Sequence, residues 1–182
     1  MMTMTLFQHR ARNFGIASTL VGATLLLFAA TAAEAQSQGC TTTRLTDPPR
    51  EVIRCGNGLT ITAETSASFR LQGEERAGGP TGAVLNRKAL LVETPAGKVR
   101  PFQINTPHAI ASVRGTIWAI DVGGGRTSVF VERGAVSVGR GGGGAGVVLR
   151  PGEGVDVGDT GPLTVKRWPQ ERVRALLARF GR

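Results

Sequence analysis

The chain has 182 residues, with 22 Lys and Arg against 13 Asp and Glu, which gives a net charge of +9 at pH 7. Its two histidines and two cysteines are too few for a zinc or iron site built from protein ligands, and we expect neither a metal nor a cofactor. All but three of the basic residues are arginine and 26 residues are glycine, a bias that codon composition explains as well as an acidic ligand does.

The first 35 residues have the features of a signal peptide. Arg10 and Arg12 precede a nearly uncharged stretch over residues 14–33. Ala33-Glu34-Ala35 then places small residues at the positions that signal peptidase requires, so we expect cleavage before Gln36. Removing residues 1–35 from the 182-residue chain leaves 147 residues, the size of one domain.

Two other fates of this segment stay open. The apolar stretch is nearly long enough to span a bilayer, so it is also consistent with an uncleaved anchor in the inner membrane. Cys40 is also a candidate for lipidation, although Ser37 stands where a lipoprotein signal usually has leucine. No later segment resembles a membrane span.

Cys40 and Cys55 predict a disulfide, because an exported chain with a cysteine pair and no metal-ligand cluster usually forms one. A loop of 15 positions would close, which is worth about 3 kcal/mol on the entropy model. The bond would fasten a loose N-terminal strand to the domain.

Short strands separated by Gly, Pro and Asn follow along the chain. Leu59, Ile61 and Ala63 alternate with polar residues, the period of a half-buried strand. Arg133-Gly134 between two such runs predicts a hairpin with glycine in the left-handed conformation, and a turn or bulge is expected at 86–88. The expected strands cover residues 51–55, 59–64, 68–71, 83–85, 89–93, 99–104, 127–132, 135–138, 147–149, 154–157 and 163–165. Such spacing favours an all-β roll or sandwich of mainly antiparallel strands.

The C-terminus has the period of a helix instead. Pro169 can open it, and an apolar stripe one face wide follows. Arg172, Arg174 and Arg179 are predicted to face away from that stripe. The stripe either packs on its own domain or docks, together with Arg172, on a partner or a membrane surface. Its members are Val173, Leu176, Leu177 and Phe180.

No catalytic motif is present in the sequence, and we predict a protein without enzymatic activity. His108 has no cysteine, second histidine or carboxylate pair nearby, and we interpret it as a strand-start residue bonded to backbone. The glycines of residues 139–146 lack the Lys-Ser/Thr ending of a phosphate-binding loop. An enzyme acting on polysaccharide stays a minor alternative, since folding can bring distant carboxylates together.

The densest stretch of the chain, residues 106–122, carries a family resemblance. Thr-Pro, then Val-Arg-Gly-Thr, an aromatic residue and a strand that ends in Asp-Val resemble the FecR-type domain. The Gly turn at Gly134 and the later Gly-Glu resemble it as well, over residues 83–158 in all. The residues that carry the resemblance are Thr106, Pro107, Val113, Arg114, Gly115, Thr116, Trp118, Asp121, Gly134, Gly152 and Glu153.

The resemblance implies an all-β periplasmic domain without catalytic residues. The best-known members of the family sit in the inner membrane and relay a signal from an outer-membrane iron-siderophore receptor to a cytoplasmic sigma factor. Those members carry a cytoplasmic anti-sigma region before their membrane span, whereas about 14 residues precede the apolar stretch here. We therefore expect the envelope domain without the sigma-factor arm.

Arg114 lies between apolar residues, and we expect it to be buried in mid-strand and paired with Glu132 or Asp121. Arg114→Ala is then expected to lower stability more than binding. The alternative makes Arg114, Thr116 and Trp118 a surface for an acidic partner. Both tryptophans are expected to pack in the core or at a sheet edge.

The sequence therefore predicts a non-catalytic periplasmic binding or sensor module, possessing a signal peptide (1–35), a disulfide-stapled β segment (36–82), a FecR-like β domain (83–168) and an amphipathic helix (169–182). Its expected partners are an envelope protein or an acidic envelope polymer, with peripheral membrane contact as a further option and no nucleic acid. The alternative is a structural component of the envelope, held to anionic surfaces by its charge and helix.

Overall fold

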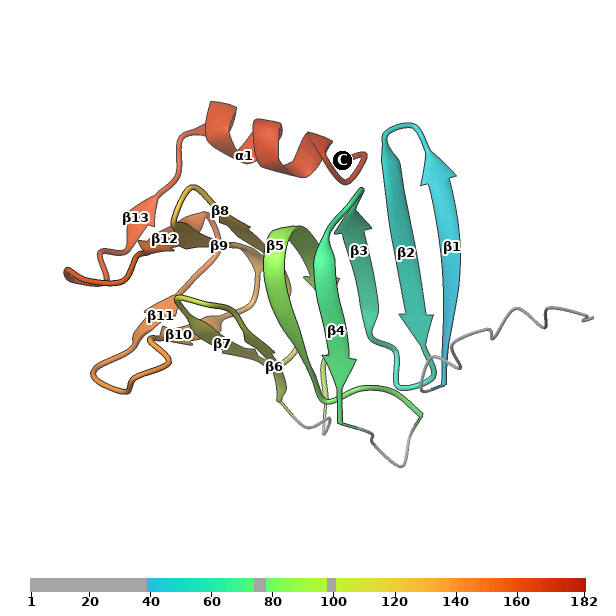
Figure 1. The fold of residues 1–182 in the computed structure, drawn as a ribbon, viewed down its shortest axis with the longest axis horizontal. Helices are drawn as coiled ribbons and strands as arrows, with labels where there is room; N and C mark the ends of the chain where they lie inside the picture. The colour runs from blue at the N-terminus through green and yellow to red at the C-terminus, as the bar shows by residue number, and fades with distance from the viewer. Residues whose placement is uncertain (1–38, 74–77, 98–100) are drawn as a thin grey trace, which may run out of the picture. The chain divides into compact units, whose positions relative to one another are not determined.

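The computed structural model describes residues 39–73, 78–97 and 101–182, within the compact unit Ala35–Arg182. The predicted signal peptide and its cleavage site lie outside the described residues. Within them no helix is long and apolar enough to cross a membrane. The all-β prediction is confirmed, because the described residues form thirteen strands and one C-terminal helix (Figure 1).

The strands are short, as their alternating apolar residues and frequent glycines predict. In chain order they are β1 (Cys40–Thr46), β2 (Pro49–Cys55), β3 (Thr60–Glu64), β4 (Ser68–Gln72), β5 (Gly82–Glu93), β6 (Phe102–Asn105), β7 (Ile110–Val113), β8 (Ile117–Gly123), β9 (Arg126–Arg133), β10 (Val136–Gly139), β11 (Val147–Leu149), β12 (Glu153–Val157) and β13 (Lys166–Arg167), followed by α1 (Gln170–Ala178).

Two sheets share the long strand β5. Its C-terminal half pairs with β3 and β8, within a first sheet of order β1-β2-β3-β5-β8-β9-β12-β13. Its N-terminal half pairs with β4 and β6, within a second sheet of order β4-β5-β6-β7-β10-β11. All neighbours are antiparallel except β5 and β6. The predicted turn or bulge at 86–88 is a bend inside this one strand, with Lys88 at a φ of 68°.

Of the connections that carry the chain from one sheet to the other, three lie between β7 and β12. β7 leads to β8, β9 to β10 and β11 to β12, and the two strands of each pair lie in different sheets (Figure 1). The hairpin predicted at Arg133-Gly134 is therefore wrong, because β9 pairs with β8 and β12 while β10 pairs with β7 and β11. Arg114 likewise sits at a corner rather than in mid-strand.

The core fills the space between the two sheets. Its largest fully buried side chains include Trp118, Ile61, Leu85, Leu90, Ile104 and Ile120. These residues come from strands of both sheets, so the inward side chains of each face one another as in a sandwich.

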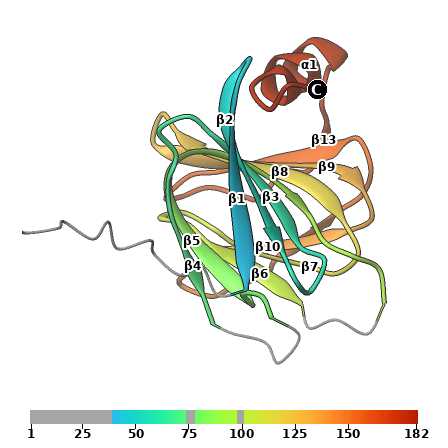
Figure 2. The ribbon, with the colours of Figure 1, turned by 90° about the vertical axis from the view of Figure 1, so that its right-hand side faces the viewer.

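Helix α1 covers the outer face of the first sheet (Figures 1 and 2). Leu176 and Phe180, 6% and 3% exposed, pack with Ala89, Leu91, Ala119, Phe130 and Trp168 of the domain. Val173 and Leu177 flank this second apolar cluster. The sequence left open whether the apolar stripe packs on its own domain or docks on a partner. In the structure it packs on its own domain.

The predicted disulfide is present. Cys40 is joined to Cys55, with which it is also in register across β1 and β2. Because its sulfur atom is in this bond, the lipidation of Cys40 that we considered is wrong. The bond ties β1, whose other residues are exposed, to the body of the sheet.

Candidate functional site

The Thr106-Pro107 motif forms the turn that starts β7. Thr106 Oγ1 accepts hydrogen bonds from the backbone N–H groups of Ala109 and His108, at 2.8 and 3.3 Å, and contacts Thr127 Oγ1 at 2.8 Å. His108 precedes the strand, and its Nδ1 lies 3.2 Å from Thr127 Oγ1. His108 thus lies at the start of a strand as predicted, but the predicted bond to backbone is wrong for its ring, which contacts the buried Thr127 hydroxyl.

Thr116 fixes the corner between β7 and β8. It is fully buried, and its N–H donates to Thr94 Oγ1 at 2.9 Å. The Thr94 N–H in turn donates to the Thr116 carbonyl oxygen at 2.9 Å. Two buried threonines thus satisfy the polar groups of a chain reversal, as burial requires. Thr116 is a structural residue here and does not line a binding surface.

Gly134 has to be glycine at the next corner. Its φ is 86°, and an added Cβ would lie 2.7 Å from Thr116 Cγ2 and 2.8 Å from the Gly115 carbonyl oxygen. The left-handed backbone predicted for this position is confirmed, although it serves a crossing between sheets.

Arg114 departs from its predicted role. Its side chain is exposed, and within the described residues it forms no hydrogen bond or ion pair. The two carboxylates expected to pair with it have other partners: Asp121 binds Arg179, and Glu132 binds Arg182. The pairing is wrong because the C-terminal segment, which follows the β strands, brings its own arginines over these acids.

Arg179 lies just after α1 and joins it to the first sheet. Its guanidinium bonds Asp121 on β8, at 2.6 Å, and Glu64 on β3. The hydrogen bond to Asp121 is the main influence that holds the pKa of Arg179 above its usual value, although partial burial opposes it. Arg179 therefore does not face solvent as predicted, and α1 is fastened by a permanent charge.

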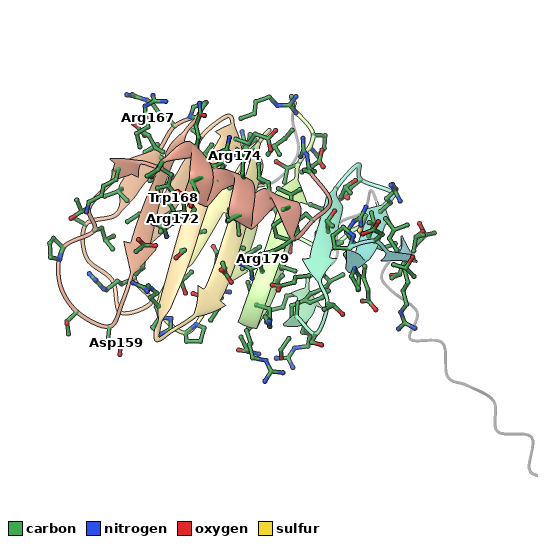
Figure 3. All side chains as sticks on the ribbon, turned by 90° about the horizontal axis from the view of Figure 1, so that it is seen from above. Asp159, Arg167, Trp168, Arg172, Arg174 and Arg179 are labelled. Carbon is green, nitrogen blue, oxygen red and sulfur yellow. A yellow bond between two sulfur atoms is a disulfide. The ribbon has the colours of Figure 1, made fainter. Side chains whose placement is uncertain are left out.

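Arg172 fastens the other end of the helix. Its guanidinium lies 3.4 Å from the ring centroid of Trp168, which itself stacks on Phe130 (Figure 3). It also bonds Asp156 Oδ2 at 3.0 Å. Burial, the largest influence, acts to raise the pKa of Asp156, but the hydrogen bonds from Arg172 and Ser128 and the nearby positive charges outweigh it and leave the pKa lowered.

Beside this contact is a charged cleft of about 410 Å³. Its ionisable groups largely neutralise one another, since Asp156 and Asp121 are already bound to Arg172 and Arg179. Its lining residues are Asp121, Gly123, Gly124, Arg126, Ser128, Asp156 and Arg172. A charged ligand that entered the cleft would have to displace these ion pairs. We therefore interpret the cleft as the place where α1 and the residue that follows it are bound to the first sheet, and not as a ligand site.

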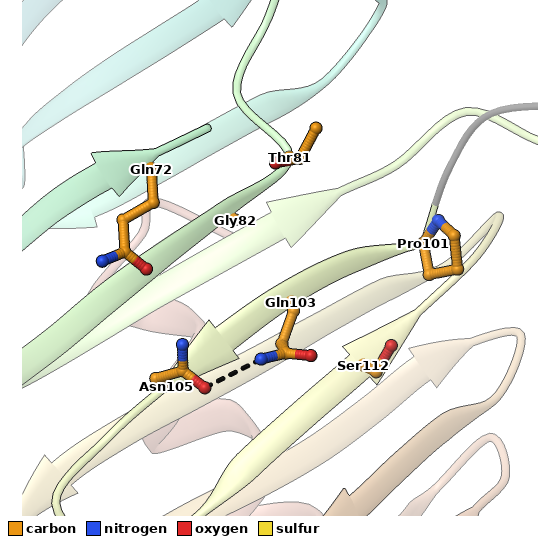
Figure 4. Close-up of a pocket in the computed structure, with 7 residues that line it drawn as sticks. All are labelled: Gln72, Thr81, Gly82, Pro101, Gln103, Asn105 and Ser112. Carbon is orange, nitrogen blue, oxygen red and sulfur yellow. Dashed lines mark hydrogen bonds between the residues drawn. The ribbon is translucent and has the colours of Figure 1, made fainter. Parts of the chain in front are cut away.

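A second cavity, of about 480 Å³, lies on the second sheet and is lined by uncharged polar side chains (Figure 4). Gln103 and Asn105 are two residues apart on β6, so both side chains point to the same face, and they are joined at 2.9 Å. Across from them is Gly82, where an added Cβ would lie 2.8 Å from the Gln103 carbonyl oxygen. We call this cavity the polar groove; it is lined by Gln72, Thr81, Gly82, Pro101, Gln103, Asn105 and Ser112.

Within the described part of the chain no group of three or more His, Cys, Asp or Glu side chains is placed to hold a metal ion. Among the residues that the structure describes, no ionisable side chain lines the polar groove. The groups that line it can donate and accept hydrogen bonds, but none of them is a general acid or base near neutral pH.

The family model described as FecR protein matches residues 50–137. These residues form a FecR domain. The match begins in β2 and therefore extends across the boundary that the sequence predicted at residue 82. It ends in β10, so the motif glycine and glutamate at 152 and 153 lie beyond it.

Two solved structures resemble the chain. Both are crystal structures of a putative anti-sigma factor from Parabacteroides distasonis ATCC 8503, at 1.65 and 2.50 Å resolution. The TM-scores are 0.55 and 0.48, the identities 19% and 18%, and each match covers 78% of this chain. The matched part spans 62% of that protein's length, about three fifths. At this identity the likeness shows the fold alone. No curated protein matches the chain.

The structure thus divides the sequence motif of the FecR domain by role. Thr106, Thr116, Trp118, Gly134 and Asp121 hold turns, corners, the core and the helix, whereas Arg114 and Pro107 are exposed. The polar groove was not predicted. Its residues come from four strands and two connections, and single Gln, Asn, Ser and Thr side chains give no sequence signal when they are far apart in the chain.

Proposed function

We propose that this chain is an exported, non-catalytic FecR-domain module that binds a protein partner in the cell envelope as part of signal transduction. The FecR domain supports a signalling role, and the feature that carries the binding proposal is the polar groove on the second sheet. Its location in the periplasm follows from the predicted signal peptide and is part of the proposal.

The chemistry of the polar groove suits an extended protein segment. Gln72, Gln103 and Asn105 each offer an amide N–H donor and a carbonyl acceptor, and Thr81 and Ser112 offer hydroxyls. A peptide backbone presents alternating donors and acceptors of the same kind without charge. Gly82 keeps one wall of the groove open to a backbone, because it has no side chain there.

The experiment is a capture from envelope extract with residues 36–182, at low and at high salt, with recovered proteins identified by mass spectrometry. We expect one envelope protein to survive high salt, because hydrogen bonds in a groove are screened far less than exposed charges. Gln103→Ala combined with Asn105→Ala should remove that protein, whereas Asn86→Ala, an exposed amide on β5, should retain it.

Recovery that is lost at high salt, or that is the same for the groove variant and the Asn86→Ala control, would contradict the proposal. In either case the chain would not recognise a protein through the polar groove. The purified partner would then be titrated against both variants by calorimetry, so that a failure to bind is separated from poor capture.

The alternative that the chain is an envelope component held by α1 lacks its main support. The apolar stripe of the helix is buried against Ala89, Leu91 and Phe130 of the same domain. A helix that covers its own sheet has no apolar face left for a membrane or a partner.

A further inference from the structure

The three corners between the sheets that lie from β7 to β12 share a pattern in which an arginine precedes a glycine. Arg114-Gly115 connects β7 to β8, Arg133-Gly134 connects β9 to β10, and Arg150-Pro151-Gly152 connects β11 to β12. The three glycines have φ values of 65°, 86° and 82°. Glycine adopts this conformation without strain, so each corner turns at the glycine and exposes the arginine before it.

The corners lie side by side along one edge of the molecule. In the second sheet Val113 and Leu149 are both in register with Val136, so the strands next to the three corners are neighbours. A Cβ on Gly134 would touch the Gly115 carbonyl oxygen, and the Gly152 N–H donates to the Val131 carbonyl oxygen at 2.8 Å.

A fourth arginine lies next to the third of these corners. Arg167 on β13 is in register with Glu153, next to the third corner, and its Nη1 lies 2.6 Å from where a Cβ on Gly152 would be. Figure 3 shows Arg167 at the rim of the domain. We call Arg114, Arg133, Arg150 and Arg167 the arginine row. Arg114 and Arg150 lie just before β8 and β12, and Arg133 and Arg167 lie on β9 and β13, so the row follows four neighbouring strands of the first sheet.

The charge of this row is not neutralised within the described residues. All four side chains belong to exposed residues, and none of them forms a hydrogen bond or ion pair there. Carboxylates on the neighbouring strands have other partners: Glu93 and Glu132 bind Arg182, and Glu153 accepts the Arg150 backbone N–H at 2.8 Å.

We propose that the arginine row binds a linear anionic polymer, an acidic polysaccharide of the envelope, as a second surface beside the polar groove. Four guanidinium groups follow one another over three strand intervals of about 4.8 Å, or roughly 14 Å in all. Guanidinium pairs carboxylate or sulfate through two hydrogen bonds, so a chain with repeated acidic groups meets several such partners at once.

A polysaccharide fits the row better than a membrane surface does. Binding in the bilayer interface needs apolar side chains that enter the lipid as well as charge. In the described part of the chain the exposed large hydrophobic residues are Leu45 and Val148, and only Val148 is close to the row, two positions before Arg150. A single valine is too little apolar surface to enter a bilayer. Binding at the arginine row therefore depends on charge and on the spacing of the arginines.

The test uses heparin, a linear acidic polysaccharide, and residues 36–182 carrying Arg114→Gln, Arg133→Gln, Arg150→Gln and Arg167→Gln. The matched control carries Arg54→Gln, Arg70→Gln, Arg87→Gln and Arg174→Gln, which removes the same charge from exposed residues elsewhere. At physiological salt we expect heparin affinity to fall about tenfold or more in the first variant and less than about twofold in the control.

Thermal melting checks that both variants are folded. If the fourfold variant is not, Arg114→Gln with Arg133→Gln is compared with Arg54→Gln with Arg70→Gln. An equal loss in row and control variants would overturn the proposal, since net charge alone would then be responsible. Binding to vesicles of phosphatidylglycerol and phosphatidylcholine without binding to heparin would also overturn it. Loss of heparin binding together with unchanged protein capture would separate this surface from the polar groove.

Discussion

At the residue scale, the arginines at the C-terminus differ from those at the corners in what surrounds them. Arg179 reaches two carboxylates that lie on different strands, and its side chain is only 29% exposed. Arg114 reaches none in the described structure. The sequence could not distinguish paired from unpaired arginines, because the acids that bind Arg179 are 58 and 115 positions away in the chain.

The first prediction concerns this difference. Arg179→Met should lower the free energy of unfolding by about 2 kcal/mol, because it leaves the partly buried Asp121 without its counterion and leaves Glu64 with Lys88 alone. Arg174→Met, on the exposed side of α1, should change it by less than about 0.5 kcal/mol. Urea denaturation of both variants makes the comparison, and equal values would show that Arg179 does not fasten the helix.

The second prediction concerns the stability of the fold at acidic pH. The pKa of Asp156 is lowered in the folded state, so its ion pair stabilises the fold above the ordinary value of 3.8 and this contribution is lost as the pH falls through the lower folded pKa. Asp156→Asn should therefore cost about 0.5 kcal/mol at neutral pH, given its partial exposure, and less at a pH well below the ordinary value of 3.8. Unfolding curves at the two pH values test this, and a deficit independent of pH would contradict it.

A third prediction concerns Gly134. Alanine there would carry a strained backbone and a Cβ within 2.8 Å of Thr116 and Gly115, so we expect a loss of about 2 kcal/mol or more. Gly141→Ala is the control, since its Cβ would meet no atom within 4 Å. A similar melting temperature for both variants would mean that the corner adapts.

At the element scale, the sequence predicted the strands better than their partners. Alternation of apolar residues depends only on each strand's own two faces, and it located β2, β3, β9, β10 and β12 closely. Which strands pair depends on the path of the chain between them. A glycine in the left-handed conformation suits both a hairpin and a crossing between sheets, so Gly134 was predicted correctly in conformation and wrongly in topology.

The fourth prediction concerns α1. Phe180→Ala should lower stability by about 3 kcal/mol, because a buried aromatic side chain leaves a cavity under the helix. Ala175→Ser on the exposed face should have little effect. Deleting residues 169–182 should give an unstable, aggregating protein. A soluble, folded truncation that had lost only an interaction would instead favour a docking role.

At the scale of the whole molecule, β5 holds the two sheets together and β1 is attached mainly through one neighbour. β5 contacts four strands along its length, two in each sheet. Among the described strands β1 pairs with β2 alone, and the disulfide joins the two. The stability of the fold is therefore expected to be uneven, highest around β5 and β8 and lowest at β1.

The fifth prediction follows from this arrangement. Replacing Cys40 and Cys55 with serine should cost up to about 3 kcal/mol for a separation of 15 residues. Amide hydrogen exchange should accelerate most in β1 and β2 and least in β5 and β8. Uniform acceleration over all the strands would show instead that the bond stabilises the domain as a whole.

The two tryptophans of the chain occupy different layers, and the chain contains no tyrosine. Trp118 is fully enclosed between the sheets and its indole N–H meets no partner among the described residues, whereas Trp168 lies under the guanidinium of Arg172 at the start of α1. Intrinsic fluorescence therefore has two separate sources. Emission from Trp118 should stay at short wavelength until the sandwich opens, and emission from Trp168 should shift to the red as soon as the helix lifts. A Trp168→Phe variant and a Trp118→Phe variant would let each event be timed by itself, without a label.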